Sequence, residues 1–109
     1  MTTKKLCEEL RKTGIPAAFA EFEKPMKPPY AVYLIERDNC IYCDGKIALH
    51  LYDVSLELYT EKRDCTSEKK IKALLDQLEI AYETDKTWIS DDKLYEIIFY
   101  FQTETEELN

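Results

Sequence analysis

The chain has 109 residues, of which 45% are hydrophobic and 34% charged, and it carries a formal net charge of −7. A disordered chain would contain fewer hydrophobic residues, and a general nucleic-acid binder or a ligand of anionic membranes would carry positive charge. These values predict one acidic domain over residues 1–109, with no nucleic acid and no membrane among its partners.

Signal peptides and membrane spans need long apolar segments, and the sequence offers none. Its longest continuous apolar run is Tyr30–Ile35, far shorter than the roughly 20 residues that a helix needs to cross a bilayer. Without an export signal, the four cysteines are expected as free thiols in a reducing compartment. The sequence therefore predicts a cytoplasmic protein.

The first predicted element is a helix over Thr3–Thr13. Its apolar residues Leu6, Cys7 and Leu10 share one face, and a glycine and a proline end the helix soon after. The next segment, Ala17–Phe22, is either a short strand or the connection that leads into one.

A proline-rich loop precedes the clearest strand. Three prolines in Lys24–Pro29 remove backbone donors and fix φ, so this segment is neither helix nor central strand. Tyr30–Ile35 follows, and its β-branched and aromatic residues predict a strand. We place a turn at Arg37–Asn39 and another short strand at Cys40–Cys43.

The dipeptide Asp44-Gly45 predicts a hairpin turn, because a type I′ turn needs positive φ at both central residues. The strand after it, Ile47–Thr60, changes phase. Its apolar residues alternate on odd positions in the first part and on even positions in the second. A one-residue slip exchanges the two faces of a strand, so we predict a β-bulge or bend near Leu51–Asp53.

A polar loop, Glu61–Asp64, precedes a second predicted helix over Thr66–Glu79. Four of its apolar residues recur at the spacing of a helix with one buried face, namely Ile71, Leu74, Leu75 and Leu78. Two final strands follow, Ile80–Ile89 and Leu94–Gln102, and then an acidic tail over about residues 103–109. The order α-(β)-β-β-β-α-β-β predicts an α+β fold with a mostly antiparallel sheet packed by two helices.

Signatures of catalysis are missing. His50 is the only histidine and lies in an alternating strand, so it would be a catalytic base only by coincidence. Gly14 and Gly45 are the only glycines, which excludes a glycine-rich phosphate loop. We therefore expect no enzymatic activity and no cofactor.

Cys40 and Cys43 have the spacing of half a zinc knuckle, but the chain has no second pair of this kind. Cys7, Cys65 and His50 would have to converge from separate elements to complete a site. Residues three apart on a strand also point to opposite faces, which disfavours a shared metal ion. We expect no metal; the alternative, a metal-dependent regulator built on Cys40 and Cys43, predicts tightly bound zinc.

Aromatic residues are concentrated on the predicted strands, and the last strand carries large side chains on both faces. Two helices suffice to cover only one face of the sheet. Part of the other face is either a protein interface, where Tyr and Trp are enriched, or is covered by the loops and tyrosine rings of the domain itself.

Several segments resemble the small tail-terminator, or tail-completion, proteins of long-tailed phages and prophages of Gram-positive bacteria. The resemblance lies in the first helix, in Lys27–Leu34 and in Val54–Asp64, and the second helix and Leu94–Ile98 extend it over nearly the whole chain. It implies a non-enzymatic α+β protein that forms a ring, typically hexameric, on the head-proximal end of the tail tube. The implied partners are further copies of this chain, the tail tube protein and the head–tail connector protein, first in the host cytoplasm and then in the virion tail.

A ring subunit needs two different contact patches, because head-to-tail contacts close a cyclic assembly. We expect these contacts at or near six residues, Tyr33, Glu57, Tyr59, Lys62, Arg63 and Asp64. The competing interpretation is a small monomeric protein-binding or inhibitor module that acts on one bacterial partner. The two interpretations differ in self-association.

Overall fold

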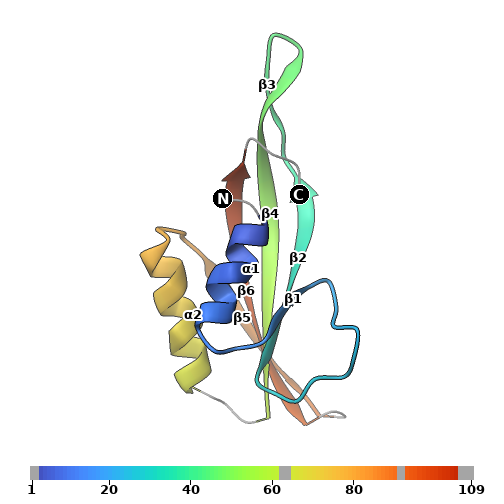
Figure 1. Cartoon of the computed structure of the whole chain (residues 1–109), viewed down its shortest axis with the longest axis vertical. Coiled ribbons are helices and arrows are strands. Elements are labelled where there is room, and N and C mark those ends of the chain that lie inside the picture. The colour runs from blue at the N-terminus through green and yellow to red at the C-terminus, as the bar shows by residue number, and fades with distance from the viewer. Residues whose placement is uncertain (1–2, 62–64, 91–92, 106–109) are drawn as a thin grey trace.

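The computed structural model of the chain describes residues 3–61, 65–90 and 93–105. Two helices pack against one face of a six-stranded, mostly antiparallel sheet, and the molecule measures 50 × 26 × 22 Å (Figure 1). The α+β class and the order of elements predicted from the sequence are confirmed.

Along the chain, the second helix lies between the first four strands and the last two. They are α1 (Thr3–Lys12), β1 (Ala17–Phe19), β2 (Tyr30–Asp38), β3 (Ile41–Cys43), β4 (Lys46–Thr60), α2 (Cys65–Gln77), β5 (Glu83–Ile89) and β6 (Leu94–Thr105). The turn expected at Arg37–Asn39 is wrong in its first two residues, because Arg37 and Asp38 still pair with β4. Pairing with the long strand β4 therefore extends β2 beyond its apolar residues, Tyr30–Ile35.

Strand β4 is the axis of the molecule. The sheet order is β1-β2-β4-β6-β5, with β1 parallel to β2 and the other pairs antiparallel. At about 3.3 Å per residue, its 15 residues span roughly the 50 Å length of the molecule. One end of β4 leaves the body and pairs only with β3, so that residues 41–49 form a projecting hairpin, here called the arm (Figure 1).

The turn at the tip of the arm is the predicted one. Asp44 and Gly45 both have positive φ, at 52° and 76°, and the flanking residues Cys43 and Lys46 pair across the hairpin. Two consecutive positive φ values are those of a type I′ turn, which matches the right-handed twist of the two strands.

The irregularity predicted in β4 lies on its neighbour instead. Glu36 is the extra residue of a bulge in β2, where the pairing with β4 shifts by one. β4 stays in unbroken register with β6 from His50 to Thr60, so the exchange of faces predicted near Leu51–Asp53 is wrong. A second shift, at Ala48, lies in the arm where β4 pairs with β3.

The core lies between the helices and the even-numbered side chains of β4. Leu56 and Phe99, on β4 and β6, are fully buried at its centre. The helices contribute Leu6 from α1 and Ile71 and Leu75 from α2. Because these apolar stripes are used against the sheet, most charged residues of both helices point outward; Glu68 of α2 is the buried exception and pairs with Lys72 and Lys86. The other face of the sheet has no helix over it (Figure 1).

Candidate functional site on the open face of the sheet

The side of the sheet without helices, here called the open face, is formed by alternate residues of four strands. In register they are Tyr30, Val32, Leu34, Glu36 and, after the bulge, Arg37 of β2, Asp53, Ser55, Glu57 and Tyr59 of β4, Glu96, Ile98, Tyr100 and Gln102 of β6, and Glu83, Asp85 and Thr87 of β5. Carboxylates and tyrosines dominate this set. It is therefore a polar aromatic surface rather than a second apolar core.

Two carboxylates converge on one hydroxyl of the open face, near the end of β4. The Tyr59 hydroxyl oxygen lies 2.8 Å from Oε2 of Glu57 and 2.7 Å from Oε2 of Glu96. A phenol has a single hydrogen and donates it to one acceptor at a time. The second contact is a hydrogen bond only when one of the two carboxyl groups is protonated.

The electrostatics of this cluster favour retention of protons. Burial raises the pKa of the Glu57 carboxyl above its ordinary value, the Tyr59 hydroxyl opposes this rise, and the charges of Glu96 and Glu36 add to it. Burial also raises the pKa of Tyr59, and the carboxylates of Glu96 and Glu57 raise it further. The cluster therefore concentrates negative charge with no basic group among these partners.

An aromatic row continues from this cluster toward the loop after β1. The rings of Tyr59 and Tyr30 stack with centroids 5.0 Å apart, and Phe22 meets Tyr30 edge to face at 5.8 Å. A groove of about 500 Å³ lies between residues 20–26 and the Tyr30, Val32, Glu57 and Tyr59 side of the sheet. The loop after β1 thus borders part of this face, and the tyrosines lie beside a groove; that the rest of the face is a protein interface stays a prediction.

Negative charge also extends along β6 toward the middle of the open face. The pKa of Tyr100 is raised by burial first, and then by the carboxylates of Asp85, Glu96, Glu36 and Glu57. Four acidic side chains from all four long strands thus act on one tyrosine. The open face consequently carries a strongly negative field.

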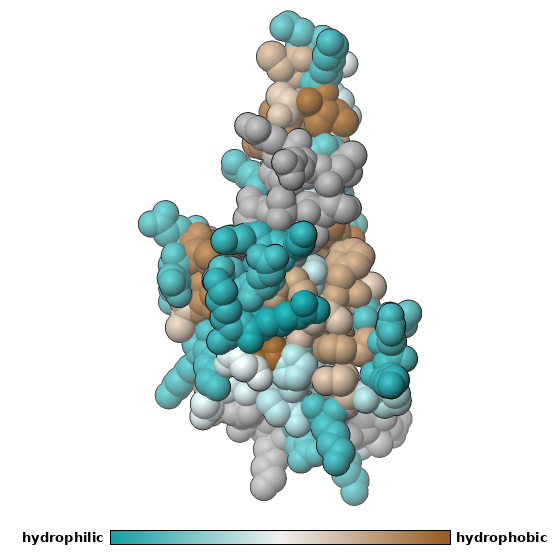
Figure 2. Space-filling model, viewed as in Figure 1, coloured by the Kyte–Doolittle hydropathy of each residue, from teal (hydrophilic) through white to brown (hydrophobic). Residues whose placement is uncertain are grey.

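The helices carry the opposite charge. Together α1 and α2 contain seven basic and four acidic residues, a net charge of +3 in a chain whose total is −7. The remainder of the chain therefore carries −10. Hydrophilic side chains cover the helix side in Figure 2, and Lys12, Lys69 and Lys70 are exposed there. The molecule is thus electrostatically two-sided.

The six residues expected at contacts do not form one group. Glu57 and Tyr59 lie together on the open face. Tyr33 points to the other face, is 3% exposed and packs against Phe19 at 5.4 Å between ring centroids. It offers almost no surface to a partner, so we leave it out of the candidate surface. Lys62, Arg63 and Asp64 lie outside the described residues.

Sequence reasoning did not find Glu96, the third member of the cluster with Glu57 and Tyr59. Tyr59 and Glu96 are 37 residues apart and meet only because β4 and β6 pair. The available signal was the alternation of the last strand, which places Glu96, Ile98 and Tyr100 on one face. Alternation within one strand does not give the register between β4 and β6.

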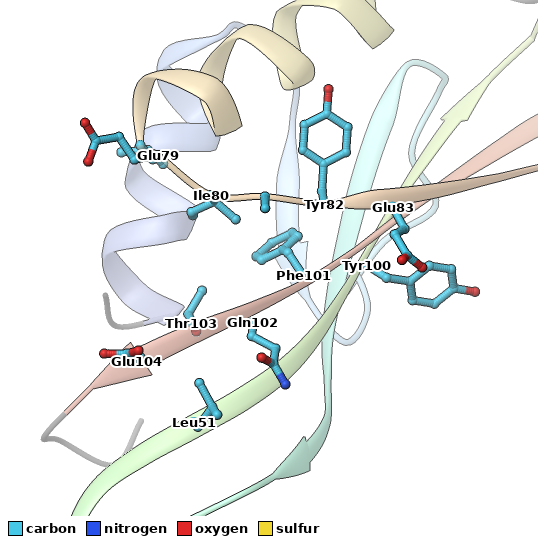
Figure 3. A pocket seen from close by; sticks show the side chains of 12 residues that line it. Leu51, Glu79, Ile80, Tyr82, Glu83, Tyr100, Phe101, Gln102, Thr103 and Glu104 are labelled. Carbon is cyan, nitrogen blue, oxygen red and sulfur yellow. The ribbon is translucent and has the colours of Figure 1, made fainter.

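A second hollow, of about 820 Å³, lies at the edge of the sheet beside the end of α2 (Figure 3). Figure 3 shows Phe101 and Thr103 on one side of β6 and Tyr100 and Gln102 on the other, so the hollow follows the strand edge. Its lining includes no histidine, cysteine or basic residue. The ionisable side chains that line it are the carboxyl groups of Glu79, Glu83 and Glu104 and the hydroxyls of Tyr82 and Tyr100.

Metal-ligating side chains gather elsewhere, where the arm joins the body. Asp38, Cys40 and His50 place one donor atom each within 4.8 Å of one another. Cys43 is not a member of this group; its sulfur lies at the arm tip, 4.0 Å from Oδ2 of Asp44. The two cysteines of the Cys-x-x-Cys motif are thus at different places, Cys40 at the base of the arm and Cys43 at its tip.

Among the residues that the structure describes, no helix is long and apolar enough to cross a membrane. No protein-family model matches the chain, and no curated protein sequence is significantly similar to it. The fold is similar to that of a chain in the solved structure of the virion of a native gene transfer agent particle. The two share 12% sequence identity and align with a TM-score of 0.66 over 90% of this chain and 84% of that chain. At this identity the likeness shows a common fold.

Proposed function

We propose that the protein is a non-enzymatic structural protein of a phage or phage-like virion. In this proposal it forms a ring, typically of six subunits, caps the head-proximal end of the tail tube and joins the tube to the head–tail connector. It would assemble in the host cytoplasm and remain in the virion tail. The observation that carries the proposal is the fold shared with a chain of the gene transfer agent virion over 90% of this sequence.

The distribution of charge supports head-to-tail association of identical subunits. The acidic open face of one subunit is complementary to the helix side of the next, where exposed lysines such as Lys69 and Lys70 lie. A contact between two different faces repeats around a rotation axis and closes into a ring. The partner that we assign to the open face is therefore a second copy of this chain.

The centre of the proposed contact is the cluster of Glu57, Tyr59 and Glu96. Tyrosines that present a flat ring and a hydroxyl are enriched at the energetic centres of protein interfaces. Residues Lys62, Arg63 and Asp64 follow β4 and Glu61 in the sequence, and we retain them as proposed contacts. Because Asp85 is exposed on the same face, its charge is accessible to a neighbouring lysine.

Charge reversal tests this contact. We expect light scattering on a sizing column, over a range of protein concentrations with and without Mg²⁺, to detect a discrete closed oligomer. Asp85→Lys and Lys70→Glu should each weaken it, and the double variant should recover part of the loss. Lys46→Glu is the matched control for Lys70→Glu, since it changes the net charge equally but lies at the tip of the arm, outside both the open face and the helix side.

A monomer at all concentrations leads to a second measurement, because rings of this kind can require the tube as a template. Purified tail tubes should then bind the protein at their ends, and Asp85→Lys should reduce that binding. A monomer that also does not bind tail tubes contradicts the proposal and favours the small monomeric binding or inhibitor module.

A further inference from the structure

Three side chains with different metal-ligating atoms meet at the base of the arm. His50 Nδ1 lies 2.6 Å from Oδ2 of Asp38 and 3.8 Å from Sγ of Cys40. His50 is 7% exposed, Cys40 is half-buried and Asp38 is exposed. The cluster is therefore anchored in the protein on one side and open to an incoming ion on the other.

The backbone fixes this meeting independently of the three side chains. Asp38 is the last residue of β2, and His50 lies on β4, where it begins its register with β6. The residue between Asp38 and Cys40 is Asn39, whose backbone N–H donates to the Leu51 carbonyl at 2.7 Å. The Asn39 side-chain amide also donates to Oδ2 of Asp53, at 3.0 Å. The link that carries Cys40 is thereby held against β4.

The geometry is close to that of a tetrahedral zinc site. Zinc bonds of about 2.0 Å to nitrogen and oxygen and 2.3 Å to sulfur place neighbouring ligand atoms roughly 3.3–3.5 Å apart. The observed separation of 3.8 Å between Cys40 and His50 needs little change. The 2.6 Å hydrogen bond between His50 and Asp38 would open by about 0.7 Å as the ion replaces the shared proton.

We propose that Asp38, Cys40 and His50 form a binding site for a zinc ion, with water as the fourth ligand. A thiolate, an imidazole nitrogen and a carboxylate oxygen are the three ligand types that proteins use for zinc. The ring of Tyr52 stacks on the imidazole with centroids 5.8 Å apart and limits its rotation. This site concerns the arm and does not depend on the function proposed for the open face.

A bound ion would fasten the arm to the body. The three ligands come from the end of β2, the link to β3 and β4, so a single ion would join all three segments. Outward of this point the arm has only the pairing between β3 and β4. The arm has solvent-exposed hydrophobic residues, among them Tyr42, which is 66% exposed. Figure 2 shows hydrophobic residues, in brown, along this projection. Zinc would thus fix the direction in which this apolar surface is presented.

The test uses the full-length protein, stripped of metal and kept reduced. Titration with Co²⁺ should produce the near-ultraviolet charge-transfer absorption of a cobalt–thiolate bond, saturating at one ion per chain. Zn²⁺ should abolish the absorption by competition. Cys40→Ser should remove the band. Asp38→Asn should weaken Co²⁺ binding by about 10- to 100-fold or more, because loss of even an indirect partner of a zinc ligand has an effect of that size.

Cys43→Ser is the matched control, because it removes an exposed thiol from the same arm and leaves the cluster intact. It should bind Co²⁺ like the parent protein. Circular dichroism checks that every variant is folded, and Zn²⁺ should raise the unfolding temperature of the parent and Cys43→Ser but not of Cys40→Ser.

Absence of the thiolate band in the folded parent protein would overturn the proposal and leave an ordinary Asp38–His50 hydrogen bond beside a thiol. Equal loss of the band in Cys43→Ser and Cys40→Ser would also overturn it, because the ion would then be held by the Cys-x-x-Cys pair. Neither result would bear on the ring, whose test is charge reversal on the open face.

Discussion

Glu57 and Glu96, on neighbouring strands, direct their carboxylates at the same hydroxyl oxygen of Tyr59, at 2.8 and 2.7 Å. The arrangement places two like charges in a half-buried setting with one proton between them. Such a cluster lowers stability when both groups are ionised and becomes favourable when a proton or a cationic partner arrives. The proposed lysine-rich partner would supply such a cation.

The first prediction concerns pH. The pKa of Glu57 is raised by burial and by Glu96 and Glu36, so folding favours its protonated form. The associated stability is fully present below the ordinary pKa of 4.5 and is lost as the pH rises through the higher folded value. Glu57→Gln should therefore raise the unfolding temperature at pH 7, with a gain that shrinks as the pH falls toward 4.5. Thermal unfolding followed by circular dichroism measures this.

Asp76→Asn serves as the control for that series, because Asp76 is an exposed carboxylate on α2. Its unfolding temperature should follow the parent protein across the pH range. A gain for Glu57→Gln that is equal at pH 4 and pH 7 would contradict the assigned cause.

The second prediction concerns the shared hydroxyl. Tyr59→Phe keeps the stacking on Tyr30 but leaves two carboxylates without their donor, which should lower the free energy of unfolding by about 1–2 kcal/mol. Urea unfolding at pH 7 gives this value. Tyr100→Phe, on the same face but exposed, should change it by less than about 0.5 kcal/mol. Equal losses in the two variants would contradict the role given to the Tyr59 hydroxyl.

The third prediction separates the two faces of β4. Leu56 is fully buried beneath the helices, so Leu56→Ala should cost about 2–5 kcal/mol of unfolding free energy. Leu51 lies on the same strand with its side chain on the other face and only half-buried. Leu51→Ala should cost clearly less in the same urea experiment. A reversed order would mean that the helices cover the other face.

The fourth prediction separates the body from the arm. Gly14, at the end of α1, and Gly45, at the arm tip, both have positive φ with no atom near an added Cβ, so alanine would cost only backbone strain. Gly14→Ala should lower the global free energy of unfolding by about 1 kcal/mol. Gly45→Ala should instead speed amide hydrogen exchange in β3 and leave the unfolding temperature nearly unchanged, because the arm opens locally. Equal global losses would show that the arm unfolds together with the core.

Local signals predicted the elements well, and the arm shows their limit. The Asp44-Gly45 turn sets the pairing of Cys43 with Lys46, but by itself it would place Cys40 opposite Leu49. The register shift at Ala48 moves the pairing by one residue and brings Cys40 toward His50. That shift has no signal in the sequence, and the spacing between Cys40 and Cys43 says nothing about cross-strand neighbours, so the cluster with Asp38 was not predicted.

Face assignment was less predictable, for a physical reason. Tyr30–Ile35 is apolar on both faces, so alternation alone does not say whether Tyr33 faces the helices or the open side. In β4 the buried even positions include His50 and Tyr52, whereas the exposed side of the arm carries Ile47. Hydropathy therefore suggested a phase change where the strand continues straight. Which face is covered depends on the docking of α1 and α2, a tertiary event.

The continuity of β4 has a mechanical consequence. A single strand passes from the tip of the arm through the centre of the sheet, bonded in turn to β3, β2 and β6. Such an element transmits a load as a lever does, because bending it at the base breaks hydrogen bonds on both sides. A force on the tip would therefore tilt the whole subunit rather than deflect a loop. In the proposed ring, contact at the tip of one arm would then also change the tilt of the adjacent subunits.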